Sequence, residues 1–347
     1  MTNYFNAQIY RYLLLVFGFM VTFSYASYAQ FITTWKTDNP GKSNRNQITI
    51  PAKGTYQIAW KEVGNSANKG SAQGKDATTV TFPKAGTYQI SITGQLKQIR
   101  FADQGDKAKL LTIEQWGNVV WTDMSQAFKG CYNMDCVAKD APNLSQLTSL
   151  GEMFSGCTRF NGKIGHWNTS QIMVMNGMFR GATSFNQSIG EWNTSEVVIM
   201  SEMFRGATSF NQPIGEWNTS EVFRMDRMFY NAKSFNQPIG QWNTHKVGRM
   251  REMFFKAKLF NQPIGGWYTS QVFDMTGMFR EAIAFNQSIG GWNTSQVTKM
   301  NKMFSGATAF NQPIQKWNIS KVKKMTDMFK GATNFKQDLS HWKQLKK

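Results

Sequence analysis

A tryptophan recurs every 25 residues through the second half of the chain, and this spacing limits the fold more than any other feature. The series runs from Trp167 to Trp342 with no insertion to break its register. An unbroken period of this length is typical of a solenoid. One such unit buries too little apolar surface to fold alone, so each must stack on its neighbours. We therefore predict regular solenoid repeats over residues 161–347, ending in a basic segment.

Other residue types keep the same step and identify the expected core. A phenylalanine file runs from Phe160 to Phe335, and Met-Phe pairs and isoleucines recur at the same interval. The 27 Phe, 20 Met and 12 Trp are explained if each unit fills the same core positions again. A cofactor box would not need identical residues in every unit. We expect these files to be core and no cofactor to bind.

Within one unit the pattern predicts a short strand followed by a helix. Val222, Met225 and Phe229 are spaced i, i+3 and i+7, as on one face of a helix. The Asn-Thr-Ser string at 218–220 would cap that helix, although it also matches a glycosylation acceptor. The stretch 213–217 is the expected strand, with its proline at the first residue. The predicted fold class is an α+β repeat, a solenoid of 25-residue strand-helix coils.

The residues before the repeats predict a small β-rich domain over 30–105. Gly-Thr-Tyr-Gln-Ile occurs at 54–58 and again at 86–90, and suggests two related hairpins. The stretch 64–76 is rich in Gly, Ser, Ala and Lys and is expected to be a loop. Residues 106–160 carry degenerate repeats, which are typical of the units that cap a solenoid.

The first 29 residues predict export. Arg11 precedes an apolar run that is short for a membrane span of roughly 20 residues. Small residues at Ser27 and Ala29 suit a signal peptidase that cleaves after Ala29. An uncleaved anchor is the alternative. We expect a secreted or cell-surface protein with no transmembrane segment in its mature form.

Two interpretations of the cysteines stay open. Cys131 and Cys157 occupy equivalent places in successive units, which would allow a disulfide and leave Cys136 over. Alternatively, all three are buried free thiols that act as small apolar residues. No histidine lies near them, so we expect no metal site.

The formal net charge of +18 favours acidic partners such as acidic glycans or acidic proteins. Export argues against nucleic acid. Variable positions after each valine and after each Met-Phe pair place cations and aromatics along the expected helical side. This candidate binding ridge comprises Phe223, Arg224, Tyr230, Arg249, Phe255, Phe273, Arg280, Lys299 and Lys324. The alternative is a solvated row of cations at helix ends.

The sequence offers little that could carry catalysis. His166, His245 and His341 lie in different units with no cysteine or carboxylate at ligand spacing. No phosphate loop, nucleophile elbow or zinc pattern is present. We expect no enzyme, and a carbohydrate-active enzyme that uses the N-terminal domain is the weakest alternative.

The repeat motif resembles a known family. Met-Phe-x-x-Ala-x-x-Phe-Asn-Gln-x-Ile-Gly-x-Trp-Asn-Thr-Ser, seen at 203–220, resembles the repeat of BspA-family leucine-rich-repeat surface proteins and of mycoplasma surface lipoproteins. The resemblance covers roughly residues 113–342. It implies a leucine-rich-repeat-like solenoid on a bacterial surface, adhering to host matrix or plasma proteins or to other cells, and no catalytic residues. The alternative from another class is a self-associating structural or matrix protein.

Overall fold

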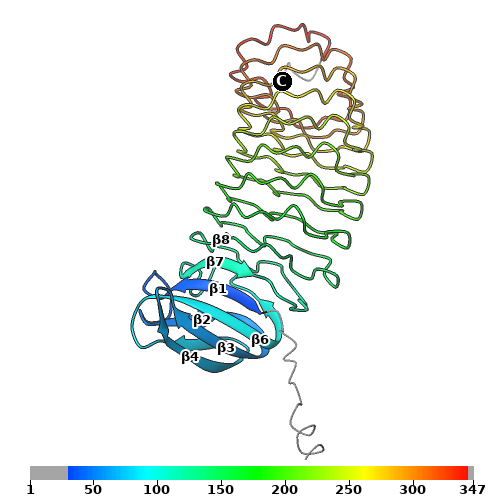
Figure 1. Ribbon diagram of the computed structural model, residues 1–347. Coiled ribbons are helices and arrows are strands. Elements are labelled where there is room, and N and C mark those ends of the chain that lie inside the picture. The colour runs from blue at the N-terminus through cyan, green and yellow to red at the C-terminus, as the bar shows by residue number, and fades with distance from the viewer. Residues whose placement is uncertain (1–29, 343–347) are drawn as a thin grey trace, which may run out of the picture.

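The computed structural model describes residues 30–342, so the predicted export segment and its cleavage point lie outside the described residues. A β-sheet domain forms one end of the molecule, and a stack of coils extends from it (Figure 1). The strands are β1 (Phe31–Lys36), β2 (Gln47–Ile50), β3 (Ala52–Glu62), β4 (Asn65–Lys75), β5 (Thr78–Thr81), β6 (Thr87–Ile99), β7 (Leu110–Gln115) and β8 (Asp135–Cys136).

The β domain is built on one six-stranded sheet with the strand order β4-β3-β6-β1-β7-β8, and β2 and β5 form a separate pair. Burial alternates along β1, as expected for a sheet with one face on the core. The first Gly-Thr-Tyr-Gln-Ile copy lies in β3, and the second begins at Gly86, directly before β6, and continues into it. These strands pair antiparallel with Trp60 opposite Ile90. The copies therefore form the centre of one sheet rather than two hairpins.

The expectation of a loop at 64–76 was wrong, because this stretch forms the edge strand β4. Its glycines have a packing role. A Cβ on Gly70 would lie 2.4 Å from the Trp60 ring, and one on Gly74 would lie 2.1 Å from the Tyr56 ring. Glycine lets the strand pass close against two large rings of β3. The polar residues between the glycines stay exposed, which suits the edge of a sheet.

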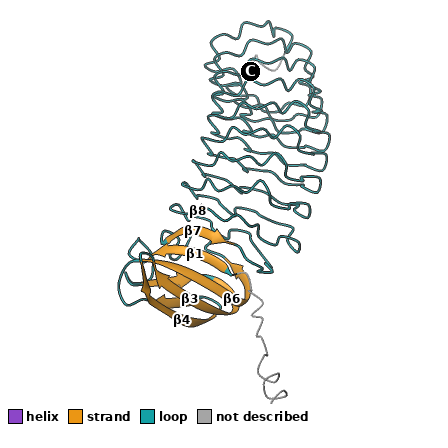
Figure 2. Cartoon of the chain, in the orientation of Figure 1, coloured by secondary structure: helices purple, strands orange, loops and turns teal. Residues whose placement is uncertain are grey.

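The predicted strand-helix coil was also wrong: the described residues contain no helix, and the fold is β-rich (Figure 2). A helix requires each N–H to bond four residues back within the segment. Instead the N–H of Arg227 donates to the carbonyl of Arg251 in the next coil, at 2.8 Å. Arg227 also has a φ of 55°, which no right-handed helix accommodates. Val222, Met225 and Phe229 are buried through turns, although their spacing is helical.

The left-handed conformation recurs at the position equivalent to Arg227 in every regular coil long enough to include that position. Glycine fills it in two coils, and larger residues fill it elsewhere. The residues with positive φ at this position are Glu152, Gly177, Glu202, Arg227, Glu252, Gly277, Lys302 and Asp327. A turn fixed at this position in every coil excludes the predicted helix throughout the stack.

Segment 213–217 is not a strand either. Parallel bridges between successive coils occur instead just after each repeated valine. They link Ser149, Val174, Ile199, Arg224, Arg249, Asp274, Lys299 and Lys324 in order. Beyond the bridge, the N–H groups of Arg227, Phe229 and Asn231 donate to carbonyls of the next coil at 2.6–2.9 Å, and equivalent bonds recur along the stack. The coils are therefore joined by a backbone ladder that turns interrupt, so it forms no named strand.

Side chains add further hydrogen bonds between the coils. The indole Nε1 of Trp242 donates to the carbonyl of Ile214 in the preceding coil, at 3.0 Å. The Thr219 hydroxyl donates to the Asn243 carbonyl of the following coil, at 2.9 Å. Each bond recurs along the stack at the same spacing. The Asn-Thr-Ser string therefore links coils, with no helix for it to cap.

The core is a continuous column of stacked rings. We number the regular coils 1 to 8 from their first residues, Phe160, Phe185, Phe210, Phe235, Phe260, Phe285, Phe310 and Phe335. In coils 3 and 4 the rings of Phe229 and Phe235 stack with centroids 4.0 Å apart, and both are buried. Trp242 and Trp267 stack with an interplanar angle of 2°. Such offset stacking is a favoured geometry for aromatic pairs.

The β domain closes one end of this column. Strand β7 pairs in parallel with β8, which belongs to the first degenerate coil. The N–H of Phe101, just after β6, donates to the Ala127 carbonyl at 3.0 Å. The buried cluster runs unbroken from Phe31 to Trp342. The sheet is therefore the layer on which the first coil stacks.

Candidate binding surface

The residues of the predicted ridge lie on one face of the coil stack. We call it the ladder face: the segment that begins after each repeated valine and ends two residues after each Met-Phe pair, residues 223–231 in coil 3. Phe223 and Phe273 are exposed there, at 44% and 43%. Gly248 lies between them in coil 4, and a Cβ on it would be 3.3 Å from the Phe273 ring. The two rings therefore do not combine into one aromatic platform.

Phe255 is not available to a partner, contrary to the prediction, because it is only 5% exposed. Its ring centroid lies 4.5 Å from that of Tyr230. The guanidinium of Arg280 lies 5.0 Å from the Phe255 centroid, and the ammonium of Lys256 lies 5.1 Å away. Cations are attracted to the faces of aromatic rings. The neighbouring coils thus cover this ring from outside.

Most cations of the predicted ridge are already paired. Asp226 is buried between Arg224 and Arg249, with charged atoms 3.5 and 3.3 Å apart. Arg280 pairs with Glu281 at 3.6 Å. The predicted ridge is therefore much less basic than its residues suggest. The helix-end alternative also fails, since no described residue is helical.

A chain of ion pairs crosses the earlier coils on the same face. Glu202 contacts Arg180 at 3.3 Å and Arg227 at 3.4 Å, and Arg227 reaches Glu252 at 2.6 Å. Burial alone would raise the pKa of Glu202, but hydrogen bonds and charges from Arg205 and its neighbours lower it. The Glu202 carboxylate therefore stays ionised and offsets the arginines around it.

The later coils differ sharply in charge. Residues 285–347 contain eleven lysines and two aspartates, a net charge of +9 out of the chain's +18. On the ladder face, Lys299 forms one ion pair, at 3.9 Å to Asp274. Lys302, Lys323, Lys324 and Lys330 of that face form no ion pair with any described residue. We name the exposed set Lys299, Lys302, Lys323, Lys324 and Lys330 the basic end surface.

Lys299 and Lys324 of this set belong to the predicted ridge, whereas Lys302 does not. Lys302 occupies the left-handed position, and the helical interpretation placed that position away from the ridge. Asp226 and Glu202 were missed for the same reason. The left-handed position and the one before it carry acidic residues in some units and basic residues in others. This change of sign from unit to unit is visible in the sequence and could have identified Lys302, Asp226 and Glu202.

No disulfide joins Cys131 and Cys157, because both thiols are free and buried, as is that of Cys136. The Cys157 thiol donates to the Phe128 carbonyl at 3.0 Å. Burial raises the pKa of Cys136 to about 12 and raises that of Cys131 well above its usual value. Thiols in this state are poor nucleophiles.

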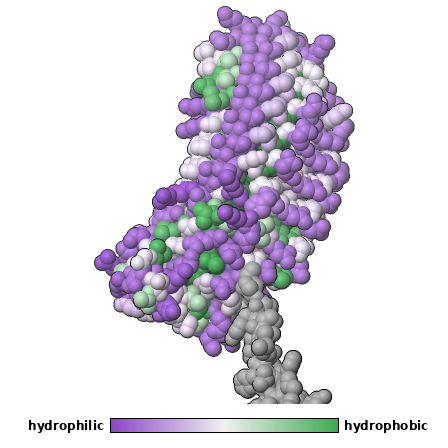
Figure 3. Space-filling view, in the orientation of Figure 1, coloured by the Kyte–Doolittle hydropathy of each residue, from purple (hydrophilic) through white to green (hydrophobic). Residues whose placement is uncertain are grey.

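The histidines are not brought together. The Nε2 atoms of His166 and His341 lie 3.3 and 2.9 Å from backbone carbonyls, and His245 stacks on Tyr268 with centroids 3.5 Å apart. Residues 30–342 contain no group of three His, Cys, Asp or Glu side chains placed to hold a metal ion. The same residues include no helix long and apolar enough to cross a membrane. Apolar surface on the visible side occurs only in small patches (Figure 3).

Comparisons with known proteins identify the repeat. Searches of curated proteins and of solved structures found no significant match. The DUF285 family model, described as a Mycoplasma protein of unknown function, matches residues 122–241, 187–273 and 260–346. These overlapping segments cover most of the chain, including its regular coils, and the chain therefore belongs to the DUF285 family.

Proposed function

We propose that this chain is an exported or surface-displayed repeat protein that binds an acidic macromolecule through its basic end surface. One observation carries the proposal. Arginines in the earlier coils are paired with carboxylates, whereas Lys302, Lys323, Lys324 and Lys330 are exposed without an ion pair among the described residues. Unpaired cations on one surface attract polyanions and speed their association.

The location outside the cytoplasm rests on the N-terminal sequence and on the resemblance of the repeat to BspA-type surface proteins. The partners that fit are acidic extracellular proteins, including matrix and plasma proteins, or acidic glycans. We assign no catalysis to the chain, since its three histidines lie in different coils and engage carbonyls or a ring.

Phe273 supplies an apolar contact at the border of the basic end surface. Its carbonyl accepts a hydrogen bond from the Thr298 hydroxyl at 3.0 Å, so it adjoins the coil of Lys299 and Lys302. Aromatic residues beside cations are enriched where proteins meet partners. Phe223 lies two coils further away, among paired arginines, and contributes less in this arrangement.

The test is binding of residues 30–347, which contain the whole described fold, to arrays of matrix proteins, plasma proteins and acidic glycans. We expect saturable binding to one class at physiological salt. Changing the five lysines of the basic end surface to glutamate should weaken it at least tenfold. Phe273→Ala should weaken it less, and the loss should persist at raised salt.

A matched control changes five exposed lysines of the β domain to glutamate, Lys53, Lys61, Lys69, Lys75 and Lys97. This variant has the same net charge as the first but an intact basic end surface. Equal loss of binding in both variants would show that total charge acts and no site exists. Absence of binding to every partner would overturn the proposal.

A further inference from the structure

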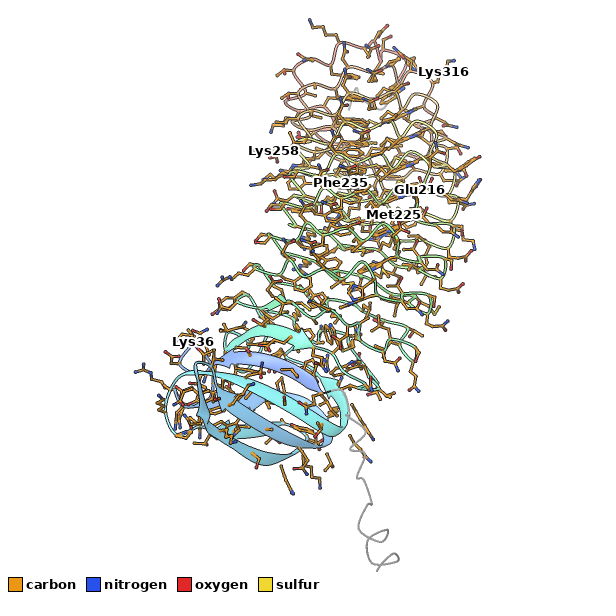
Figure 4. The ribbon with its side chains drawn as sticks, in the orientation of Figure 1. Lys36, Glu216, Met225, Phe235, Lys258 and Lys316 are labelled. Atoms are coloured by element: carbon orange, nitrogen blue, oxygen red, sulfur yellow. The ribbon has the colours of Figure 1, made fainter. Side chains whose placement is uncertain are left out.

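A second surface of the stack carries charges in a different order. In each coil, one position directly precedes the repeated tryptophan and another directly precedes the repeated valine. We call the row that these two positions form along the stack the dipolar edge. Its residues, from coil 2 to coil 7, are Glu191, Glu196, Glu216, Glu221, Gln241, Lys246, Gly266, Gln271, Gly291, Gln296, Lys316 and Lys321. Figure 4 shows Glu216 and Lys316 on the same side of the stack, with Lys316 nearer the C-terminal end.

The dipolar edge is acidic at one end and basic at the other. Coils 2 and 3 contribute only glutamates, and Glu191, Glu196 and Glu216 form no ion pair with any described residue. Coil 7 contributes only lysines, Lys316 and Lys321, both exposed. Between them the positions hold glutamine and glycine, apart from Lys246, which pairs with Glu221 at 2.6 Å.

An exposed aromatic pair occupies the middle of the dipolar edge. Tyr268 in coil 5 is 55% exposed and stacks on His245 of coil 4. Nearby, Gly266 and Gly291 stand where other coils carry Glu, Gln or Lys, and a Cβ on either would meet nothing within 4 Å. Tyrosine at the centre of a surface, with open space beside it, suits an interface anchor.

A shallow groove runs beside the acidic half of the dipolar edge. It is lined by the exposed Pro213, Pro238 and Pro263 and by the glycines two residues after them. These glycines are needed for stacking, since a Cβ on Gly215 would lie 2.6 Å from the Pro238 carbonyl oxygen. The groove therefore offers apolar surface close to Glu191 and Glu216, without bulky side chains to hold a partner away.

We propose that two copies of this chain pair antiparallel along the dipolar edge. In a two-fold interface, residue i of one copy contacts residue j of the other and the reverse. With the axis near Tyr268 in coil 5, coil 3 faces coil 7, which brings Glu216 opposite Lys316. Tyr268 then meets its own symmetry mate at the centre. A parallel arrangement would place like charges together, which is unfavourable.

This inference does not rest on the proposed binding function, because it uses different residues and a different partner. The basic end surface belongs to the ladder face, while the dipolar edge lies before the valine. The experiment below needs no external ligand. Loss of partner binding and loss of pairing are therefore separate results.

The test is sedimentation equilibrium of residues 30–347 over a wide concentration range at physiological salt. We expect a reversible dimer. Reversing only the acidic end (Glu216→Lys with Glu221→Lys), or only the basic end (Lys316→Glu with Lys321→Glu), should weaken dimerisation at least tenfold. Combining all four changes should restore it, because opposite charges again face one another.

Two further variants separate pairing from folding and total charge. Tyr268→Ala should weaken the dimer at least tenfold while leaving the circular dichroism spectrum unchanged. Lys61→Glu with Lys69→Glu, on the β domain, changes charge as much as the basic-end reversal and should leave dimerisation unaltered. Three results would each overturn the proposal: a monomer at all concentrations, a dimer that neither reversal weakens, or a variant with all four substitutions that does not regain dimerisation.

Discussion

The β domain and the coil stack share one continuous core but are ordered by different interactions. In the β domain, backbone ladders run in register, and residues such as Trp60 and Ile90 face one another across strands. In the stack, the backbone N–H groups of alternate residues, such as Arg227 and Phe229, donate to carbonyls of the next coil without forming strands, and indole and hydroxyl bonds repeat beside them. The difference shows that a repeat fold can keep a backbone ladder without regular strands when every coil makes the same turns.

The two regions also treat buried charge differently. In the β domain, the ammonium of Lys109 is 4.0 Å from Asp106 and donates to the carbonyls of Ser43, Asn44 and Gln47. In the regular coils, the interior files are Phe, Met, Ile and Trp, and the buried carboxylates Asp226 and Asp274 lie at the ladder face, where arginine or lysine pairs with each. Buried charge is therefore central in the β domain but lies at the border of the apolar interior in the stack.

The largest expected effect tests the ring column of the stack. Phe235→Ala removes a buried ring that stacks 4.0 Å from Phe229, and should lower the free energy of unfolding by about 3–5 kcal/mol. Phe223→Ala, on the exposed ladder face, should change it by less than about 0.5 kcal/mol. Urea denaturation of both variants measures the contrast. Similar losses would contradict the division between column and face.

The next effect belongs to the β domain. Asp106→Asn leaves the Lys109 ammonium buried without its counter-charge and should cost roughly 3 kcal/mol at pH 7. Burial alone would raise the pKa of Asp106, but hydrogen bonds from Ser43 and Thr49 and the charge of Lys109 lower it. The stabilisation is therefore present above the unfolded-state pKa of about 3.9 and is lost as pH falls below it.

Acid denaturation monitored by circular dichroism tests whether the stabilisation by Asp106 is lost as pH falls. The wild-type chain should lose stability below about pH 4 more steeply than the Asp106→Asn variant, so that the gap between them narrows. A gap that widens with acid would mean that Asp106 is destabilising when ionised.

A smaller effect concerns how closely the coils approach one another. A Cβ on Gly265 would lie 2.5 Å from the Ser288 carbonyl oxygen, whereas one on the adjacent Gly266 meets nothing within 4 Å. Gly265→Ala should cost about 1–3 kcal/mol through overpacking. Gly266→Ala is the matched control and should be within about 0.5 kcal/mol of wild type. Thermal unfolding measures the stability of both variants. Equal losses of stability would contradict a close approach of Gly265 to the Ser288 carbonyl.

The sequence was sufficient for the 25-residue register and for the buried files, because uniform spacing and apolar character are both visible in it. It was insufficient for the coil itself. Turns at positions such as Arg227 produce the same i, i+3, i+7 burial as a helix, and only φ distinguishes them. Glycine at Gly177 and Gly277 hinted at the left-handed turn, but larger residues occupy that position in the other coils.

The candidate surface was predictable only in part for a related reason. A side chain's exposure follows from its position in the repeat, as at Phe223 and Lys324, but its neighbours follow from how adjacent coils meet. Asp226 lies between Arg224 and Arg249 because the next coil brings Arg249 alongside. No spacing within a single unit contains that contact. Charge compensation across coils therefore required the structure.

The smallest effect isolates a single ladder bond of the stack. Trp242→Phe keeps the ring stacking with Trp267 but removes the indole donor to the Ile214 carbonyl, which then keeps only the longer bond from the N–H of Trp217, at 3.4 Å. The loss of this one hydrogen bond should cost about 0.5–1.5 kcal/mol. Trp167 is the matched control, since its buried Nε1 has no hydrogen-bond partner among the described residues. Trp167→Phe removes a donor that makes no bond, so it should cost less than Trp242→Phe when both are measured by urea denaturation. If the two substitutions cost the same, the indole bonds add nothing beyond ring packing, and the stack would be ordered by its core and its backbone bonds.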